Sequence, residues 1–94
     1  MGWVYAFANA SMQGILKIGA TRREVTESLA EANKEDEWGP PKPYVVACYA
    51  QVEDPFAVKR SMRTALAGLR VHPHRDFYRA TTDEARALFA QLGR

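Results

Sequence analysis

The sequence predicts an α+β fold in one small domain that spans residues 1–94. Two runs near the N-terminus alternate large and small side chains with the period of a strand, and a third run at residues 44–52 is rich in β-branched and aromatic residues. The segments between and after these runs carry apolar residues at helical spacing. A chain of 94 residues can bury one modest core, which excludes elaborate multi-domain chemistry.

The first two runs predict a β-hairpin with a loop of several residues. The segment GWVYAFAN alternates aromatic with smaller side chains, and the segment GILKIGA places Lys17 on the face that Ile15 and Gly19 share. The link between them is too long for a two-residue turn, but Asn9 and Gly14 supply turn chemistry. Strands paired in this way can bring Tyr5 and Lys17 to the same face of a sheet.

A short amphipathic helix is expected over residues 23–34, where Val25, Leu29 and Ala32 recur about one helical turn apart. The segment EDEWGPPKP that follows predicts a surface loop, because its glycine and three prolines forbid helix and ladder alike. Trp38 in this loop is expected to cover the core rather than to serve as a platform for a ligand.

Residues 44–52 are expected to form a central or well-covered strand because they are apolar on both faces. Cys48, the single cysteine of the chain, lies in this strand and cannot form an intrachain disulfide. A small core residue is the favoured interpretation, and a reactive thiol is the alternative.

A basic amphipathic helix is predicted to begin at Asp54 and Pro55, which supply an N-cap and a proline at the first helical position. Its apolar stripe consists of Val58, Met62, Ala65, Leu66 and Leu69. The basic residues Lys59, Arg60, Arg63 and Arg70 lie off this stripe.

The last quarter of the chain predicts a short extended piece followed by a helix. Residues 71–80 form an irregular connection that ends in the extended piece, and Thr81 to Glu84 form a capping box that opens the final helix. That helix is expected to bury Ala85, Leu88, Phe89 and Leu92. The expected order is strand, strand, helix, strand, helix, short extended piece, helix.

The charge of the chain is divided unevenly. The net charge is +2 overall, −3 over residues 1–54 and +5 over residues 55–94, where seven of eight cations are arginine. Arginine suits phosphate oxygens, although a solvated helix face is an equally good interpretation of the charge alone. No apolar run approaches the ~20 residues that span a bilayer, and the N-terminal residues lack a signal-peptide pattern, so an intracellular protein without membrane attachment is expected.

Three motifs, in their order, resemble those of the GIY-YIG nuclease superfamily. They are Trp3-Val4-Tyr5, then Lys17-Ile18-Gly19 after a small loop, and a late segment from Arg70 to Tyr78 that contains RDFY. The resemblance is to the short phage and large-virus branch, which has KIG in place of YIG, and it covers nearly the whole chain. It implies a small three-stranded antiparallel sheet flanked by helices.

The resemblance also implies a site for phosphodiester hydrolysis. In that family the tyrosine of the first motif helps to activate water, which assigns Tyr5 the role of base. Lys17 and either Arg22 or Arg23 would contact phosphate, and Asp76 would hold Mg²⁺ or Mn²⁺ in the place of the family's glutamate. Such a set supplies a positioned nucleophile, cationic stabilisation and a metal.

Several positions depart from the family's pattern. Ser28 stands where the first helix of the family carries an arginine, and Arg63 stands at the place of a histidine that this branch often has. Asp76 is one methylene shorter than the glutamate it replaces. A separate metal pattern, His72 and His74 with Asp76, is also present, but such histidines are more often polar loop residues.

Three functions follow as hypotheses. The first is a metal-dependent DNA endonuclease. The second is a nucleic-acid-binding module of the same fold without catalysis, in which Arg60, Arg63, Arg70, Arg75 and Arg79 track phosphates. The third is a protein-interaction factor that binds an unidentified partner through exposed aromatic residues and the acidic first helix.

Overall fold

The computed structural model describes residues 1–35, 42–71 and 75–93, and it contains one antiparallel sheet with three helices. The elements in chain order are β1 (Gly2–Asn9), β2 (Ile15–Thr21), α1 (Val25–Glu35), β3 (Tyr44–Val52), α2 (Pro55–Ala65), the 3₁₀ turn η1 (Ala67–Leu69), β4 (Phe77–Arg79) and α3 (Thr82–Leu92). This order confirms the α+β prediction. None of the described helices is long and apolar enough to cross a membrane.

The sheet has four strands rather than the expected three, in the order β3-β1-β2-β4. The predicted short extended piece becomes β4, in which Phe77 lies opposite Lys17 and Arg79 lies opposite Ile15. A further backbone hydrogen bond of 2.9 Å runs from the Ile18 N–H to the Asp76 carbonyl. Three residues in isolation do not specify a strand, so this one depends on its pairing with β2.

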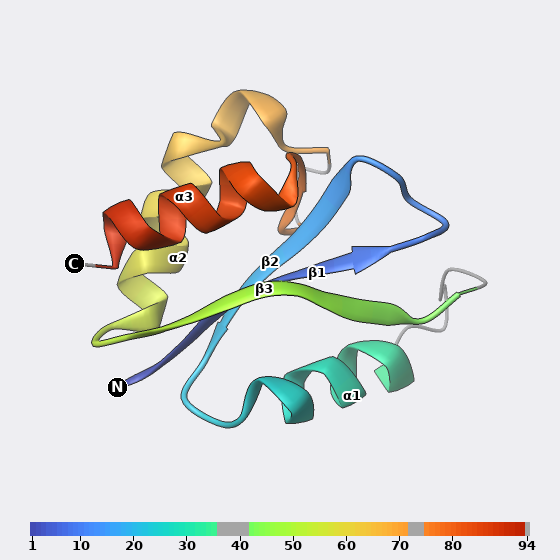
Figure 1. Cartoon of the computed structure of the whole chain (residues 1–94), viewed down its shortest axis with the longest axis horizontal. Helices are drawn as coiled ribbons and strands as arrows, with labels where there is room; N and C mark the ends of the chain where they lie inside the picture. Colours follow the sequence, from blue (N-terminus) through green and yellow to red (C-terminus); the bar gives the residue numbers. More distant parts are fainter. Residues whose placement is uncertain (36–41, 72–74, 94) are drawn as a thin grey trace.

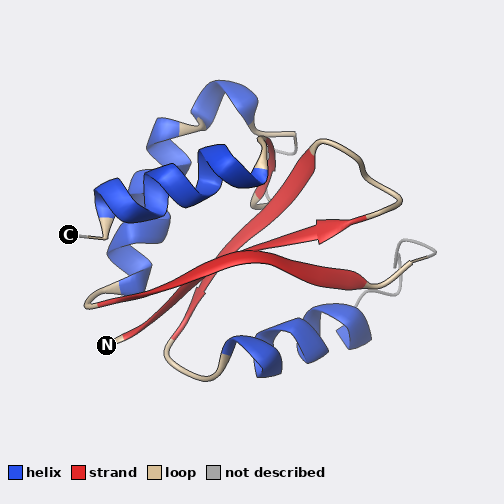
Figure 2. Ribbon diagram, in the orientation of Figure 1, coloured by secondary structure: helices blue, strands red, loops and turns tan. Residues whose placement is uncertain are grey.

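Helices cover both faces of the sheet, α1 on one side and α2 with α3 on the other (Figures 1 and 2). The larger cluster lies under α2 and α3 and includes Val4, Ile18, Met62, Tyr78 and Phe89. The smaller cluster lies under α1 and includes Phe7, Val25, Ala32 and Tyr44, with Tyr5 packed at its margin. Strand alternation therefore turns Tyr5 and Phe7 toward α1, and Val4 and Ala6 toward α2 and α3.

Strand β3 differs from its prediction because it lies at an edge of the sheet and contains a bulge. Val46 lies opposite Phe7 and Cys48 lies opposite Ala6, which leaves Ala47 as an extra residue. The bulge reverses the alternation, so Val46 packs in the smaller cluster and Cys48 in the larger one. The run is apolar on both faces because it contributes to two cores in succession, and Tyr49 remains 59% exposed.

The predicted helix starts are confirmed. The Asp54 side chain accepts a hydrogen bond of 3.1 Å from the Ala57 N–H, Pro55 opens α2, and both bonds of the Thr81–Glu84 capping box are present in α3. The apolar stripe of α2 is shorter than expected, because α2 ends at Ala65. Both Ala65 and Leu69 are exposed, since the chain turns into η1 after Leu66.

Cys48 is buried, as expected for a core residue. Burial raises the pKa of its thiol, although the charge of Arg86 partly offsets this effect. A thiol with a raised pKa is a poor nucleophile. The positions of Trp38 and of His72 and His74 lie outside the described residues.

Candidate nucleic-acid interface

A hollow of about 480 Å³ lies at the junction of β1, β2, α1 and the first turn of α2. Its polar lining consists of Tyr5, Lys17, Thr21, Arg22, Arg23, Ser28 and Glu31. The four residues for which the resemblance implies contact with water or phosphate therefore border one hollow. Three of them are cations, and Glu31 is the one acid in the lining.

The Tyr5 side chain reaches this hollow because the position opposite it on β2 has no side chain. Tyr5 lies opposite Gly19, and a Cβ atom on Gly19 would collide with the ring and hydroxyl of Tyr5. The ring also stacks on Phe7, with centroids 4.2 Å apart and planes at 21°. The glycine of the Lys17-Ile18-Gly19 motif thus has a steric role, since it lets the Tyr5 ring lie across β2.

The Tyr5 hydroxyl remains protonated at neutral pH. Burial raises its pKa, a side-chain hydrogen bond with Ser28 lowers it, and the charges of Glu31 and Asp76 raise it again, with a net increase. A protonated phenol donates and accepts hydrogen bonds, whereas a general base must give up its proton. The electrostatics of the hollow therefore suit a hydrogen-bonding role for Tyr5.

The cations of the hollow are held in different ways. Arg23 forms ion pairs with Glu27 at 3.4 Å and with Glu31, and both glutamates are on α1. The Arg22 guanidinium instead lies 5.5 Å from the centre of the Phe56 ring, a cation–π geometry that leaves its N–H groups able to bind an anion. Lys17 places its Nζ 5.5 Å from the centre of the Tyr44 ring.

A second cationic cluster surrounds Asp76 at the start of β4. Asp76 forms ion pairs with Lys59 at 3.0 Å, Arg63 at 3.0 Å and Arg70 at 3.7 Å. The Tyr78 hydroxyl donates a further hydrogen bond of 3.3 Å to Asp76 Oδ1. We refer to Lys59, Arg63, Arg70 and Asp76 as the Asp76 cluster.

The Asp76 cluster lies on the α2 side of the sheet, and Asp76 does not line the hollow of Tyr5. The charge of Asp76 nevertheless contributes to the raised pKa of Tyr5, so the two groups are electrostatic neighbours. For Asp76 itself, burial acts to raise the pKa of the carboxyl. The hydrogen bonds and charges of Lys59 and Arg63 outweigh that effect and hold the pKa below its ordinary value.

A divalent cation does not fit Asp76 in this arrangement. Mg²⁺ requires oxygen lone pairs, but both oxygens of Asp76 already accept hydrogen bonds from Arg63, and Lys59 lies against Oδ2. Three positive groups around one carboxylate would also repel the ion. Within residues 1–35, 42–71 and 75–93, no three His, Cys, Asp or Glu side chains are grouped as metal ligands.

The five arginines expected to track phosphates lie in different surroundings. Arg63 and Arg70 belong to the Asp76 cluster, and Arg70 Nε also donates to the Arg75 carbonyl at 2.9 Å. Arg60 and Arg75 are exposed. Arg79 is exposed on β4, and alternation turns it to the side opposite Tyr78.

Two residues of the interface were not singled out as site residues from the sequence. Lys59 lies four residues before Arg63, and this spacing predicts that both side chains lie on one face of the helix. Phe56 lines the hollow beside Arg22, and no pattern in the sequence indicates this contact.

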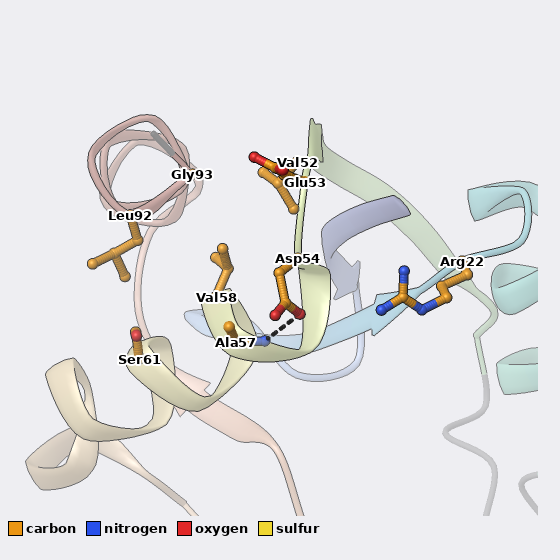
Figure 3. A pocket seen from close by; sticks show the side chains of 9 residues that line it. All are labelled: Arg22, Val52, Glu53, Asp54, Ala57, Val58, Ser61, Leu92 and Gly93. Carbon is orange, nitrogen blue, oxygen red and sulfur yellow. Dashed lines mark hydrogen bonds between the residues drawn. The ribbon is translucent and has the colours of Figure 1, made fainter. Parts of the chain in front are cut away.

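A second hollow of about 480 Å³ lies at the other side of Arg22, between α2 and the end of α3 (Figure 3). Glu53 and Asp54 line it, and the Asp54 carboxylate already caps the first turn of α2. Figure 3 shows Arg22 on one side of this hollow, apart from the residues of α2 and α3. Its two carboxylates make it a poor site for phosphate.

The contact between Tyr5 and Gly19 leads to a stability prediction. Gly19→Ala should lower the free energy of unfolding by about 1–3 kcal/mol, because the new methyl group displaces the Tyr5 ring. In a Tyr5→Leu background, Gly19→Ala should lower the free energy of unfolding clearly less, because the ring is absent. Urea unfolding of the four proteins measures the coupling. Gly68→Ala is the control, since nothing lies within 4 Å of a Cβ there. Equal costs in both backgrounds would contradict this steric role of Gly19.

The lowered pKa of Asp76 leads to a pH prediction. A carboxyl whose pKa is lower in the folded state stabilises the fold above its unfolded pKa of about 3.9, and this contribution is lost as the pH falls through the folded value. Asp76→Asn should therefore lower the free energy of unfolding by about 1 kcal/mol at pH 7, a modest figure because water screens the partly exposed partners. The difference from the unsubstituted protein should shrink below pH 4 in thermal unfolding. A difference that stays constant from pH 7 to pH 3 would refute the prediction.

Comparison with known protein families identifies the family of the chain. Residues 2–93 match the T5orf172 domain, so the match covers almost the whole chain. Searches of curated proteins and of solved structures gave no match. The chain therefore belongs to the T5orf172 domain family, which is related to nucleases.

Proposed function

We propose that this chain binds the backbone of nucleic acid, with DNA as the first candidate, and does not cleave it. The observation that carries the proposal is an excess of positive charge at two places, the hollow and the Asp76 cluster. The hollow holds three cations against Glu31, and the Asp76 cluster holds three cations against one carboxylate. An intracellular location belongs to the same proposal.

The hollow provides the groups that a phosphodiester needs. The Arg22 guanidinium is held by an aromatic ring rather than by an acid, and Lys17 lines the hollow from β2. The protonated Tyr5 hydroxyl can donate a hydrogen bond to a phosphate oxygen. Contacts of this kind position the backbone without reading its sequence.

The same residues favour binding over hydrolysis. The raised pKa keeps the Tyr5 hydroxyl protonated at neutral pH, and in that form it is poorly suited to accept a proton from water. Asp76 is engaged by three cations and does not fit a divalent metal. Ser28, at the position of the family's arginine, is buried and hydrogen bonds to Tyr5, and it brings no positive charge to the hollow.

We expect the binding to depend steeply on salt. Fluorescence anisotropy with a labelled DNA duplex should show log K falling with log salt by about 0.9 for each neutralised phosphate. Arg22→Gln should weaken binding about 3–10-fold and reduce that slope by about one unit. Arg86→Gln is the matched control, because Arg86 lies on α3 and pairs with Asp83 at 3.3 Å. Binding that is absent at low salt, or equally weakened by both variants, would contradict the proposal.

A metal-dependent DNA endonuclease of the GIY-YIG type is the second candidate, favoured by the convergence of Tyr5, Lys17, Arg22 and Arg23 on one hollow. We expect supercoiled plasmid to remain intact with Mg²⁺ or Mn²⁺ under conditions in which the protein binds it. Gel electrophoresis of the plasmid provides the readout. Nicking that requires the metal and disappears in Tyr5→Phe and Asp76→Ala would replace our proposal with the endonuclease.

A role as a protein-interaction factor would be supported by a different result. The exposed Tyr49 and Val45 on β3 are apolar and are candidate contacts for such a partner. A single stoichiometric protein partner that resists nuclease treatment, in a protein without affinity for DNA at low salt, would favour this function.

A further inference from the structure

We infer that Asp76 occupies a phosphate-binding site formed by Lys59, Arg63 and Arg70, so that a phosphodiester of bound DNA competes with this carboxylate. The inference deepens the proposed function and depends on it. It replaces the metal-ligand role that the resemblance implies for Asp76 with the role of an internal anion.

The cations around Asp76 have the geometry of an anion site. Lys59 and Arg63 lie one turn apart on α2, and Arg70 follows η1, so two neighbouring parts of the chain converge on one carboxylate. Arg63 contacts it through Nε at 3.3 Å and Nη2 at 3.0 Å to Oδ1, and through Nη2 at 3.3 Å to Oδ2. This planar fork also matches two oxygens of a phosphate group.

The three cations require an anion at this point. Like charges that converge on one spot repel each other, and the carboxylate offsets that repulsion. A phosphodiester carries one negative charge on two non-bridging oxygens, as a carboxylate carries one on its two oxygens. It can therefore take the place of Asp76 with respect to the same donors.

The cluster is accessible to such a competitor. The side chains of Lys59 and Arg63 are 30% and 48% exposed, whereas that of Asp76 is 17% exposed beneath them. DNA would therefore meet the cations first. The charge of Asp76 opposes the phosphate that approaches, and so the carboxylate lowers the affinity for DNA.

The experiment compares two Asp→Asn variants in the anisotropy assay. Asp76→Asn preserves the shape of the side chain and removes its charge, and it should tighten DNA binding about 5–10-fold and steepen the salt slope by about one unit. Asp83→Asn is the matched control, because its carboxylate is 94% exposed on α3 and contacts Arg86 alone among the described residues. It should change the affinity less than twofold. Circular dichroism at the assay temperature confirms that each variant is folded.

A double-mutant cycle tests the competition directly. Arg63→Gln should weaken DNA binding more in the Asp76→Asn background than in the unsubstituted protein, because the carboxylate no longer masks Arg63. Should Asp76→Asn fail to fold, Arg63→Gln is compared with Arg60→Gln in the unsubstituted protein. Because Asp76 masks Arg63, the loss of DNA affinity should then be smaller for Arg63→Gln than for Arg60→Gln, which changes an exposed arginine.

The outcomes separate this inference from the proposed function. An unsubstituted protein that does not bind DNA at low salt would refute the proposed function itself. A protein that binds DNA but loses affinity in Asp76→Asn would overturn the inference alone, as would an Arg63→Gln loss that is the same in both backgrounds. In the fallback comparison, an Arg63→Gln loss equal to or larger than that of Arg60→Gln would also overturn it.

Discussion

The passage of the Tyr5 ring across Gly19 is the contact on which the arrangement of the candidate interface depends. With no side chain at position 19, the ring lies over β2 and places its hydroxyl in the hollow between α1 and the start of α2. Stacking on Phe7 holds the ring at the margin of the smaller core. The packing of the β1–β2 hairpin therefore determines the shape of the hollow. The cations lie around the space that this packing leaves.

The two arginines that line the hollow are restrained to different degrees. Arg23, just before α1, is held by two glutamates of that helix, whereas Arg22 rests on the Phe56 ring without an acid in contact among the described residues. Because an ion-paired guanidinium must give up its partner to bind phosphate, Arg22 is the better contact for a ligand. The position of Phe56 on α2 thus connects the second helix to the chemistry of the first hairpin.

Features encoded by neighbouring residues could be predicted from the sequence, and features that depend on distant partners could not. The hairpin, the Asp54 cap and the capping box at Thr81 each rest on a few consecutive residues, and all are present. The bulge at Ala47 and the pairing of β4 depend on contacts between strands far apart in the chain. In the site, alternation and spacing indicated that Tyr5 and Lys17 share a face, but no local pattern showed that Arg63 and Arg70 converge on Asp76.

We interpret the departures from the GIY-YIG pattern at Ser28, Arg63 and Asp76 as changes that depend on one another. Ser28 removes from α1 the cation that the resemblance would place there, while Arg63 adds a permanent charge on α2 in the place of a histidine, which is largely neutral at pH 7. Its fork engages both oxygens of Asp76, and Lys59 adds a further positive charge at Oδ2. A carboxylate surrounded in this way serves cations of the protein rather than a metal ion. In the function that we propose, the second helix therefore adds positive charge for phosphate where the first helix carries Ser28, and this placement suits retention of a backbone better than its hydrolysis.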